Sequence, residues 1–360
     1  MLGILSKTVL FPYFIVLKIR HFLYDKQIFK SKSYPIPIIC IGNITVGGTG
    51  KTPHTEMIIR LLKDSKNIAV LSRGYKRKSK GFRLVETTNT HTDVGDEPLQ
   101  IKQKFPDVTV AVCKNRGEGI ERLMQLKPGL QMILLDDAFQ HRHVRPWRNI
   151  VLINYKRTIC GDNLLPIGRL RDLPEQIRRA DDIIITKSPA AVEIDGFTDE
   201  EKTLARVKRE EVKWRKELNL LPTQNIYFST IYYGSPAALF PNEADIRYTY
   251  SGNAVYFTGI ADDKEFKNYL VSIYKIAASI KFSDHRNFTK HDISRITEMS
   301  RQYPTAVIFT TEKDSKRLLN CKHLNNNLKT RLFYIPIEVK IVPEAMSGTF
   351  KDSLANTGNI

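Results

Sequence analysis

The feature that most constrains this chain is a glycine-rich turn between an apolar run and a helical pattern. Residues 34–41 are apolar enough to form a short buried strand. The next residues, 42–53, are GNITVGGTGKTP, and apolar side chains then recur at helical spacing. A strand, a glycine-rich turn ending in Gly-Lys-Thr, and a helix in that order predict a phosphate-binding loop.

Each residue type in this turn has a chemical purpose. Glycines let backbone N–H groups close on phosphate oxygens, and the helix N-terminus adds partial positive charge. We expect Lys51 to reach the β- and γ-phosphates and the Thr52 hydroxyl to bind Mg²⁺. Thr45 stands where the strict motif has glycine, so the loop is a variant. The predicted nucleotide-binding residues are Thr45, Val46, Gly47, Gly48, Thr49, Gly50, Lys51 and Thr52.

A second strand supplies the acidic group that such a site needs. Residues 132–137 are MILLDD, an apolar run that ends in two carboxylates. Asp136 or Asp137 is expected to hold Mg²⁺ directly or through water. The Asn-Lys-x-Asp motif of guanine-specific proteins has only loose counterparts, at residues 185–189 and 310–314. The pattern therefore predicts ATP with Mg²⁺ rather than GTP.

The order of strands and helices predicts an α/β fold. It has a P-loop NTPase-type parallel sheet with helices on both faces, plus a smaller C-terminal α/β domain. The smaller domain takes its strands from residues 254–258, 305–310 and 332–337, and the charged residues 199–218 predict an exposed helix before it. The expected divisions are residues 1–32, a membrane-associating helix region, 33–225, the kinase domain, and 226–360, the C-terminal domain.

The N-terminal region is the most apolar part of the chain. Its first basic residue is Lys7 and no small-residue cleavage site follows, unlike a signal peptide. The charge-free residues 8–17 are too few to span a bilayer, and apolar residues from Ile15 follow the spacing of an amphipathic helix. Packing of this helix on its own domain explains the pattern equally well. The six Lys/Arg against one Asp in residues 1–32 favour an anionic membrane surface.

The net charge of +18 predicts an anionic partner, namely nucleic acid, anionic lipid or a phosphorylated substrate. Nucleic acid is not expected, because the chain has no RNP-type aromatic motif and no clear helix-turn-helix. The four cysteines lie far apart in sequence and form no Cys-x-x-Cys pair. Their spacing favours a reducing compartment.

The order of the motifs resembles the tetraacyldisaccharide 4'-kinase (LpxK) family over about residues 1–340. The motifs are residues 45–53 (TVGGTGKTP), 72–75 (SRGY), 95–98 (GDEP), 136–142 (DDAFQHR), 165–171 (LPIGRLR), 284–285 (DH) and 310–314 (TTEKD). The family usually has Glu where Asp172 stands. This combination is far more specific than the glycine-rich turn alone.

The resemblance implies an ATP-dependent lipid kinase of Gram-negative lipid A biosynthesis. Its substrate would be tetraacyldisaccharide 1-phosphate, phosphorylated on the 4'-hydroxyl to give lipid IVA. The enzyme would be peripheral on the cytoplasmic face of the anionic inner membrane, attached through its N-terminal helix. Lys51, Asp96 and His285 would be catalytic, with Asp96 as the base and His285 as its partner. Candidates for contact with the substrate or its phosphate are Arg73, Arg116, Gln140, His141 and Arg171.

Two other functions stay open on the residues themselves. Another P-loop small-molecule kinase would phosphorylate a soluble acceptor, with Arg169, Arg171, Arg178 and Arg179 as a lid. It would not need the N-terminal region. A regulatory switch would hydrolyse ATP without any acceptor, and replacement of Asp96 would not affect it.

Overall fold

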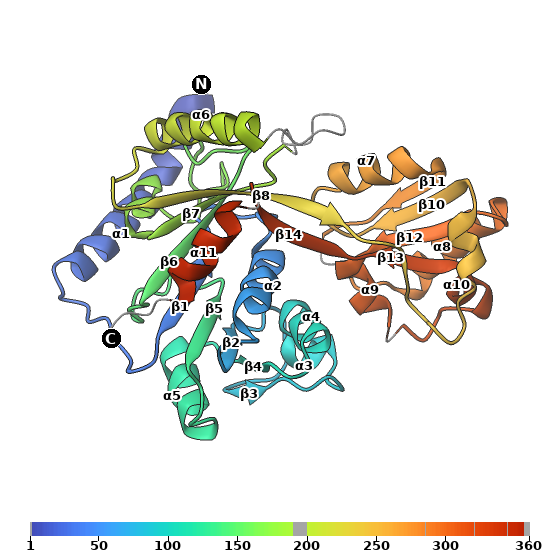
Figure 1. The fold of residues 1–360 in the computed structure, drawn as a ribbon, viewed down its shortest axis with the longest axis horizontal. Coiled ribbons are helices and arrows are strands. Elements are labelled where there is room, and N and C mark those ends of the chain that lie inside the picture. The colour runs from blue at the N-terminus through green and yellow to red at the C-terminus, as the bar shows by residue number, and fades with distance from the viewer. Residues whose placement is uncertain (1, 190–199, 285, 320, 344, 356–360) are drawn as a thin grey trace.

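The computed structural model describes residues 2–189, 200–284, 286–319, 321–343 and 345–355, which form two β-sheets with their covering helices. Figure 1 shows the larger sheet on the left and the smaller sheet on the right. The chain passes from the larger sheet to the smaller one at the end of β8 (Asn225–Tyr233) and returns at the start of β14 (Ile337–Val342).

The larger sheet has nine strands in the order β14-β8-β7-β6-β1-β5-β2-β4-β3. All neighbours are parallel except β14, which is antiparallel to β8, and β3, which is antiparallel to β4. Its other strands are β1 (Ile38–Gly42), β2 (Ile68–Ser72), β3 (Arg83–Leu84), β4 (Thr109–Val112), β5 (Met132–Asp136), β6 (Arg148–Asn154) and β7 (Asp182–Thr186). This sheet confirms the predicted parallel α/β class.

Helices cover both faces of this sheet, as predicted. One face packs against α1, α5 and α6 through Leu17, Leu123 and Trp214, among others. The other packs against α2, α4 and α11 through residues that include Ile58 and Phe350. The helices of this part are α1 (Leu2–Asp25), α2 (Lys51–Leu62), α3 (His91–Val94), α4 (Asp96–Lys104), α5 (Arg116–Leu126), η1 (Pro174–Arg179, 3₁₀), α6 (Glu200–Leu218) and α11 (Ala345–Ala355).

The smaller sheet has five strands in the order β11-β10-β12-β13-β9, parallel except for β9. Its strands are β9 (Ala237–Ala238), β10 (Asn253–Thr258), β11 (Lys275–Lys281), β12 (Val307–Thr311) and β13 (Leu332–Ile335). Its helices are η2 (Ile246–Tyr250, 3₁₀), α7 (Lys264–Ile273), α8 (Lys290–Gln302), α9 (Glu312–Leu318) and α10 (Asn326–Arg331). The chain does not pass from one sheet to the other at residue 226, because β8 and β14 belong to the larger sheet and α11 packs on that sheet.

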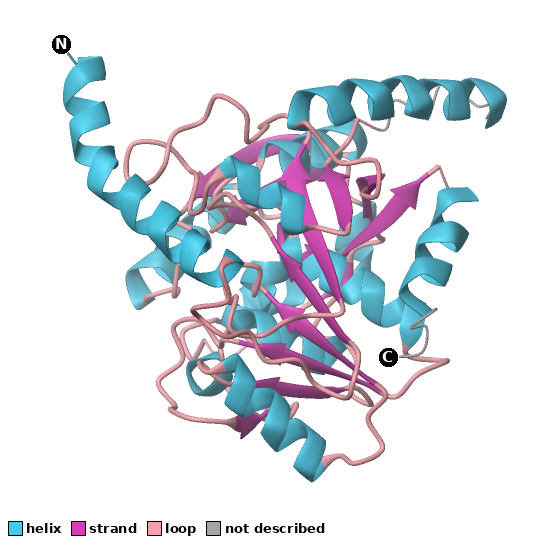
Figure 2. Cartoon of the chain, turned by 90° about the vertical axis from the view of Figure 1, so that its left-hand side faces the viewer, coloured by secondary structure: helices cyan, strands magenta, loops and turns pink. Residues whose placement is uncertain are grey.

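Helix α1 extends away from the body of the molecule toward the N-terminus, as Figure 2 shows. It runs from Leu2 to Asp25 with Pro12 inside it, so the helix starts well before the amphipathic pattern that begins at Ile15. Its C-terminal half is attached to the body by buried His21, whose Nε2 lies 2.6 Å from Asp172 Oδ1. Among the described helices, none is both long and apolar enough to cross a bilayer.

Candidate active site

The glycine-rich loop connects β1 to α2 at the carboxyl edge of the larger sheet. Gly47 and Gly50 have φ angles of 103° and 82°, in the left-handed region that favours glycine. The buried Asn43 amide donates to the Thr49 hydroxyl at 2.7 Å and ties the start of the loop to its end. The loop therefore presents a fixed backbone at the N-terminus of α2, where helix N–H groups and the helix dipole favour an anion.

The loop is also held from outside by residues 169–171. The Val46 N–H donates to the Arg169 carbonyl at 2.7 Å, and the Arg171 N–H donates to the Ile44 carbonyl at 2.9 Å. The Arg171 guanidinium adds hydrogen bonds to the Asn43 carbonyl. The segment that resembled a family motif in the sequence thus lies directly against the phosphate-binding loop.

Asp136 ends β5, the strand next to β1, and is fully buried. Within the described part of the chain, its carboxylate accepts long hydrogen bonds from the Thr55 and Ser72 hydroxyls at 3.3 Å each. Burial raises the pKa of Asp136 to about 7, and the nearby Glu97 and Asp137 carboxylates add to the rise. A bound cation would compensate this buried charge.

Asp137 follows directly and adopts a left-handed φ of 49°. Its carboxylate accepts from the Arg171 guanidinium and lies 3.8 Å from Lys51 Nζ. Burial opposes ionisation, but the hydrogen bond from Arg171 and the charge of Lys51 outweigh it and lower the pKa of Asp137. Asp137 thus positions Lys51 and Arg171 beside the loop.

The residues expected to bind Mg²⁺ are compatible with that ion. No group of three or more His, Cys, Asp or Glu in the described part of the chain could hold a metal alone. Mg²⁺ bound with a nucleotide takes only one or two protein carboxylates and completes its shell with phosphate and water oxygens. Asp136 is weakly bonded in the protein, and Asp137 is already paired with Arg171, so Asp136 is the better candidate for a direct ligand.

The five candidates for substrate contact lie at or near this edge of the sheet. Arg73 is exposed just after β2, whereas the Arg116 side chain is fully buried and donates to the carbonyls of Cys113 and Asp136. Arg171 contacts the loop as described above. Arg116 therefore supports the backbone that carries Asp136.

Gln140 and His141 follow the Asp136–Asp137 turn and are half-buried. The Gln140 side chain donates to the Asn43 carbonyl at 2.8 Å, and the Gln140 backbone carbonyl accepts from Arg20 of α1 at 2.5 Å. Burial, followed by the positive charge of Arg116, lowers the pKa of His141 to about 4. The imidazole is therefore neutral at pH 7.

Asp96 is the first residue of α4, on the side of the larger sheet that meets the smaller one (Figure 1). Its Oδ2 accepts from Nε and Nη2 of Arg317 at 3.0 and 2.8 Å. Arg317 belongs to α9 of the smaller sheet, so this ion pair joins the two parts. Arg317 is not among the residues predicted from the sequence, although it follows the motif at 310–314 by three residues.

His285, the expected partner of Asp96, lies outside the described residues. Ser283 and Arg286, which flank it in the sequence, both lie close to Gly259: a Cβ built on that glycine would be 3.5 Å from the Ser283 carbonyl oxygen and from the Arg286 Cβ. The Gly259 carbonyl accepts from Arg317 Nη1 at 3.4 Å, so this segment lies near the ion pair of Arg317 with Asp96.

Gly42 brings the two loops of the site into contact, and its substitution gives a testable prediction. A Cβ at this position would lie 2.5 Å from the Phe139 Cβ. We expect Gly42→Ala to lower the free energy of unfolding by about 1–3 kcal/mol through overpacking, and to weaken ATP binding by separating the loops. Chemical denaturation and ATP titration measure the two effects.

The matched control for this prediction is Gly252→Ala. A Cβ there would meet nothing within 4 Å. It should change stability by no more than about 0.5 kcal/mol and leave ATP binding intact. Equal behaviour of the two variants would contradict the close approach of the loops.

A parallel α/β sheet with a phosphate-binding loop and an adjacent acidic strand end defines a P-loop nucleotide-binding protein. Within that class, the chain belongs to the family described as tetraacyldisaccharide-1-P 4'-kinase (LpxK), whose model matches residues 4–355. The resemblance inferred from the sequence motifs is thereby confirmed.

Relatives of this chain are similar over nearly their whole length. The tetraacyldisaccharide 4'-kinase of Bacteroides thetaiotaomicron is 40% identical over 343 residues, covering 92% of this chain and 87% of the relative. That of Flavobacterium johnsoniae is 38% identical over 343 residues, covering 93% and 92%. The crystal structure of the "apo" form of LpxK from Aquifex aeolicus in complex with ATP has a TM-score of 0.71 at 26% identity, covering 98% of this chain and 99% of that one.

Proposed function

We propose that the protein transfers the γ-phosphoryl group of ATP to the 4'-hydroxyl of tetraacyldisaccharide 1-phosphate, which gives lipid IVA in lipid A biosynthesis. The observation that carries the proposal is the placement of Asp96. Asp96 begins α4 at the junction with the smaller sheet, where its carboxylate pairs with Arg317. The neighbouring Glu97 is close enough to Asp136 to act on its charge, so α4 starts near the acidic end of β5 beside the phosphate-binding loop. Family membership supports the acceptor.

In this proposal the loop residues 45–52 bind the ATP phosphates, and Lys51 neutralises the β- and γ-phosphates. Asp136, with Thr52 and Asp137, would hold Mg²⁺, which when bound neutralises charge on the phosphate oxygens. The acceptor oxygen forms a bond to the γ-phosphorus as the bond to the β–γ bridging oxygen breaks. Asp96, assisted by His285, takes the hydroxyl proton, and ADP leaves.

The remaining candidates would orient the acceptor. Arg73 is exposed at the end of β2, and His141 is neutral and half-buried beside the loop. We assign Arg73, Gln140, His141 and Arg171 to contact with the substrate or its phosphate. The buried Arg116 would act from behind, since it donates to the backbone of Asp136.

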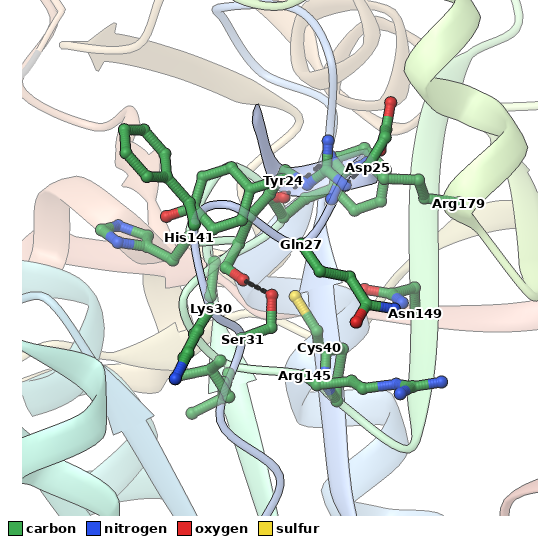
Figure 3. A pocket seen from close by; sticks show the side chains of 17 residues that line it. Tyr24, Asp25, Gln27, Lys30, Ser31, Cys40, His141, Arg145, Asn149 and Arg179 are labelled. Carbon is green, nitrogen blue, oxygen red and sulfur yellow. Dashed lines mark hydrogen bonds and ion pairs between the residues drawn. The ribbon is translucent and has the colours of Figure 1, made fainter. Parts of the chain in front are cut away.

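A cavity of about 530 Å³ below the end of α1 supports an anionic amphipathic substrate. Figure 3 shows it with Lys30, Arg145 and Arg179 at its edge and His141 on one side. Its lining is mixed and also includes apolar side chains such as Phe29, Phe139 and Val144. Basic groups beside apolar ones suit a lipid that carries a phosphate.

Helix α1 is proposed to lie on the cytoplasmic face of the anionic inner membrane. Large apolar side chains are exposed along it and just beyond its end. The surfaces of soluble monomeric proteins rarely carry so many large apolar side chains in one place. They include Phe11 (62% exposed), Val16 (59%), Ile19 (53%), Phe22 (55%), Ile28 (61%) and Phe29 (46%). Lys26 is exposed just beyond the end of α1 and would face lipid phosphates.

Replacing the exposed apolar residues of α1 tests this attachment. Ile19→Glu and Phe22→Glu together are expected to lower binding to phosphatidylglycerol-containing vesicles at least about tenfold, because each side chain stabilises the bound state by about 1.5–3 kcal/mol when buried. Co-sedimentation measures the bound fraction. Val271→Glu, at a residue 55% exposed on α7, is the matched control and should bind as the wild type does. Unchanged binding of the double variant would contradict attachment through α1.

Acceptor competition tests the proposed reaction. With ATP and Mg²⁺, mass spectrometry should show one added phosphate on tetraacyldisaccharide 1-phosphate and none on the same lipid lacking the 4'-hydroxyl. Phosphorylation of soluble sugars instead would favour the small-molecule kinase. ATP hydrolysis that is unchanged by lipid would favour a regulatory switch, and hydrolysis stimulated by nucleic acid would favour a nucleic-acid partner.

A further inference from the structure

We propose that Arg317 is a positioning residue for the phosphoryl transfer, which holds the Asp96 carboxylate in place when the smaller sheet is docked on the larger one. The inference rests on the proposed function, because it requires Asp96 to accept the proton. It adds to that function a residue from the smaller sheet and a reason why the reaction depends on docking.

The contacts of Arg317 fix its guanidinium on both sides. Nε and Nη2 donate to Asp96 Oδ2 at 3.0 and 2.8 Å, while Nη1 donates to Asp314 Oδ1 at 3.0 Å. The Arg317 side chain is only 1% exposed, and that of Asp96 is 20% exposed. A planar guanidinium with donors directed to two carboxylates has little freedom, so the position of Asp96 follows that of Arg317.

Arg317 is itself positioned by the carboxyl edge of the smaller sheet. Asp314 Oδ2 accepts from the Thr311 hydroxyl at 2.7 Å and from the Gly259 N–H at 2.8 Å. Thr311 ends β12, and Gly259 follows β10. Asp314 is completely buried, so these bonds connect Arg317 rigidly to the sheet.

A second ion pair joins α4 to α9 at the opposite end of α4 and does not include Asp96. Lys104 Nζ lies 2.9 Å from Glu312 Oε1 and 2.8 Å from Glu56 Oε2. Glu312 Oε2 also accepts from the Ile337 N–H at 3.1 Å. Lys104 therefore contributes to docking without touching the proposed base, which makes it a control for a purely structural effect.

The charge of Arg317 gives a readout that packing alone would not change. A positive charge beside a carboxylate favours its ionised form, which is the form that accepts a proton. The Arg317 variants leave all other charged or titratable groups on α4 and on the elements packed against it unchanged. These are Glu97, Lys102 and Lys104 on α4, Glu312, Lys313, Asp314 and Lys316 on α9, His91 and Asp93 on α3, and Lys51, His54, Glu56 and Arg60 on α2.

The test compares the full-length wild type with Arg317→Ala, Arg317→Lys and Lys104→Gln in kinase assays from pH 5 to 9. Arg317→Ala should lower kcat on the order of 100-fold, leave the KM for ATP within about twofold, and move the acidic limb of the kcat profile up by about one pH unit or more. Arg317→Lys should keep the acidic limb near its wild-type position with an intermediate kcat. Lys104→Gln should leave the limb unchanged.

Wild-type kcat and pH profile in Arg317→Ala would overturn the inference. So would an equal loss of kcat in all three variants with no movement of the acidic limb, because docking alone would then account for it. Arg317→Gln replaces the alanine variant if ATP titration shows that the latter does not fold. Asp96→Asn, assayed in parallel, separates the two proposals: full activity in that variant removes the base itself, whereas its loss beside normal Arg317 variants removes only the role of Arg317.

Discussion

Replacing Lys51 with alanine is expected to lower phosphoryl transfer by about 10²–10³-fold and to raise the KM for ATP. Lys51 is the first residue of α2, its side chain is 17% exposed, and its Nζ lies 3.8 Å from Asp137 Oδ2. The ammonium group is thus directed toward the space above the glycine-rich loop, where charge accumulates on the transferring phosphoryl group. Steady-state kinetics with varied ATP measure both effects.

Lys63→Ala is the control for Lys51→Ala, because it removes a lysine just beyond the other end of the same helix. Lys63 is 40% exposed and pairs with Asp64 at the surface, and such pairs contribute little. Its kinetics should match those of the wild type. Comparable losses in the two variants would mean that net charge, not the position of Lys51, is what matters.

Asp96→Asn is expected to lower kcat by about 10²–10⁴-fold while ATP binding stays nearly intact. An amide cannot take the proton of the acceptor hydroxyl, but its oxygen can still accept a hydrogen bond from Arg317. Asp96 begins α4 and has no part in the loop that follows β1, so nucleotide affinity should not depend on it. ATP titration and single-turnover transfer separate the two quantities.

The control for Asp96→Asn is Asp107→Asn, at an exposed carboxylate beyond the end of α4. It should retain full turnover. If Asp96→Asn lost ATP affinity as strongly as Lys51→Ala does, the assignment of Asp96 as the base would be wrong.

The parts of the site that sequence could predict depend on local signals. The strand before the loop, the glycine turn and α2 follow one another within about 30 residues, and their patterns are distinct. The predicted strand 34–41 forms only from Ile38, as β1, because Pro35 and Pro37 have no N–H to donate to a neighbouring strand. Asp136 lies at the predicted strand end, because the apolar run before it is also a local signal.

The contacts that sequence could not predict join distant residues. Arg317 and Asp96 are 221 positions apart, and His21 and Asp172 are 151 apart. A single arginine on a short charged helix is more often solvated, so nothing local distinguishes Arg317. The sequence also does not predict that β14 returns to the larger sheet, since a strand of alternating polarity fits the edge of either sheet.

The measurement that tests the central claim most directly is the transfer of ³²P from γ-labelled ATP to purified tetraacyldisaccharide 1-phosphate in mixed detergent micelles. Wild type, Asp96→Asn and Lys51→Ala would be assayed together, with ATP titration to verify folding. We expect labelled lipid with the wild type, phosphorylated at the 4'-position, and almost none with either variant. A folded, ATP-binding wild type that labels no lipid would contradict the proposed acceptor, and undiminished labelling by Asp96→Asn would contradict the proposed base.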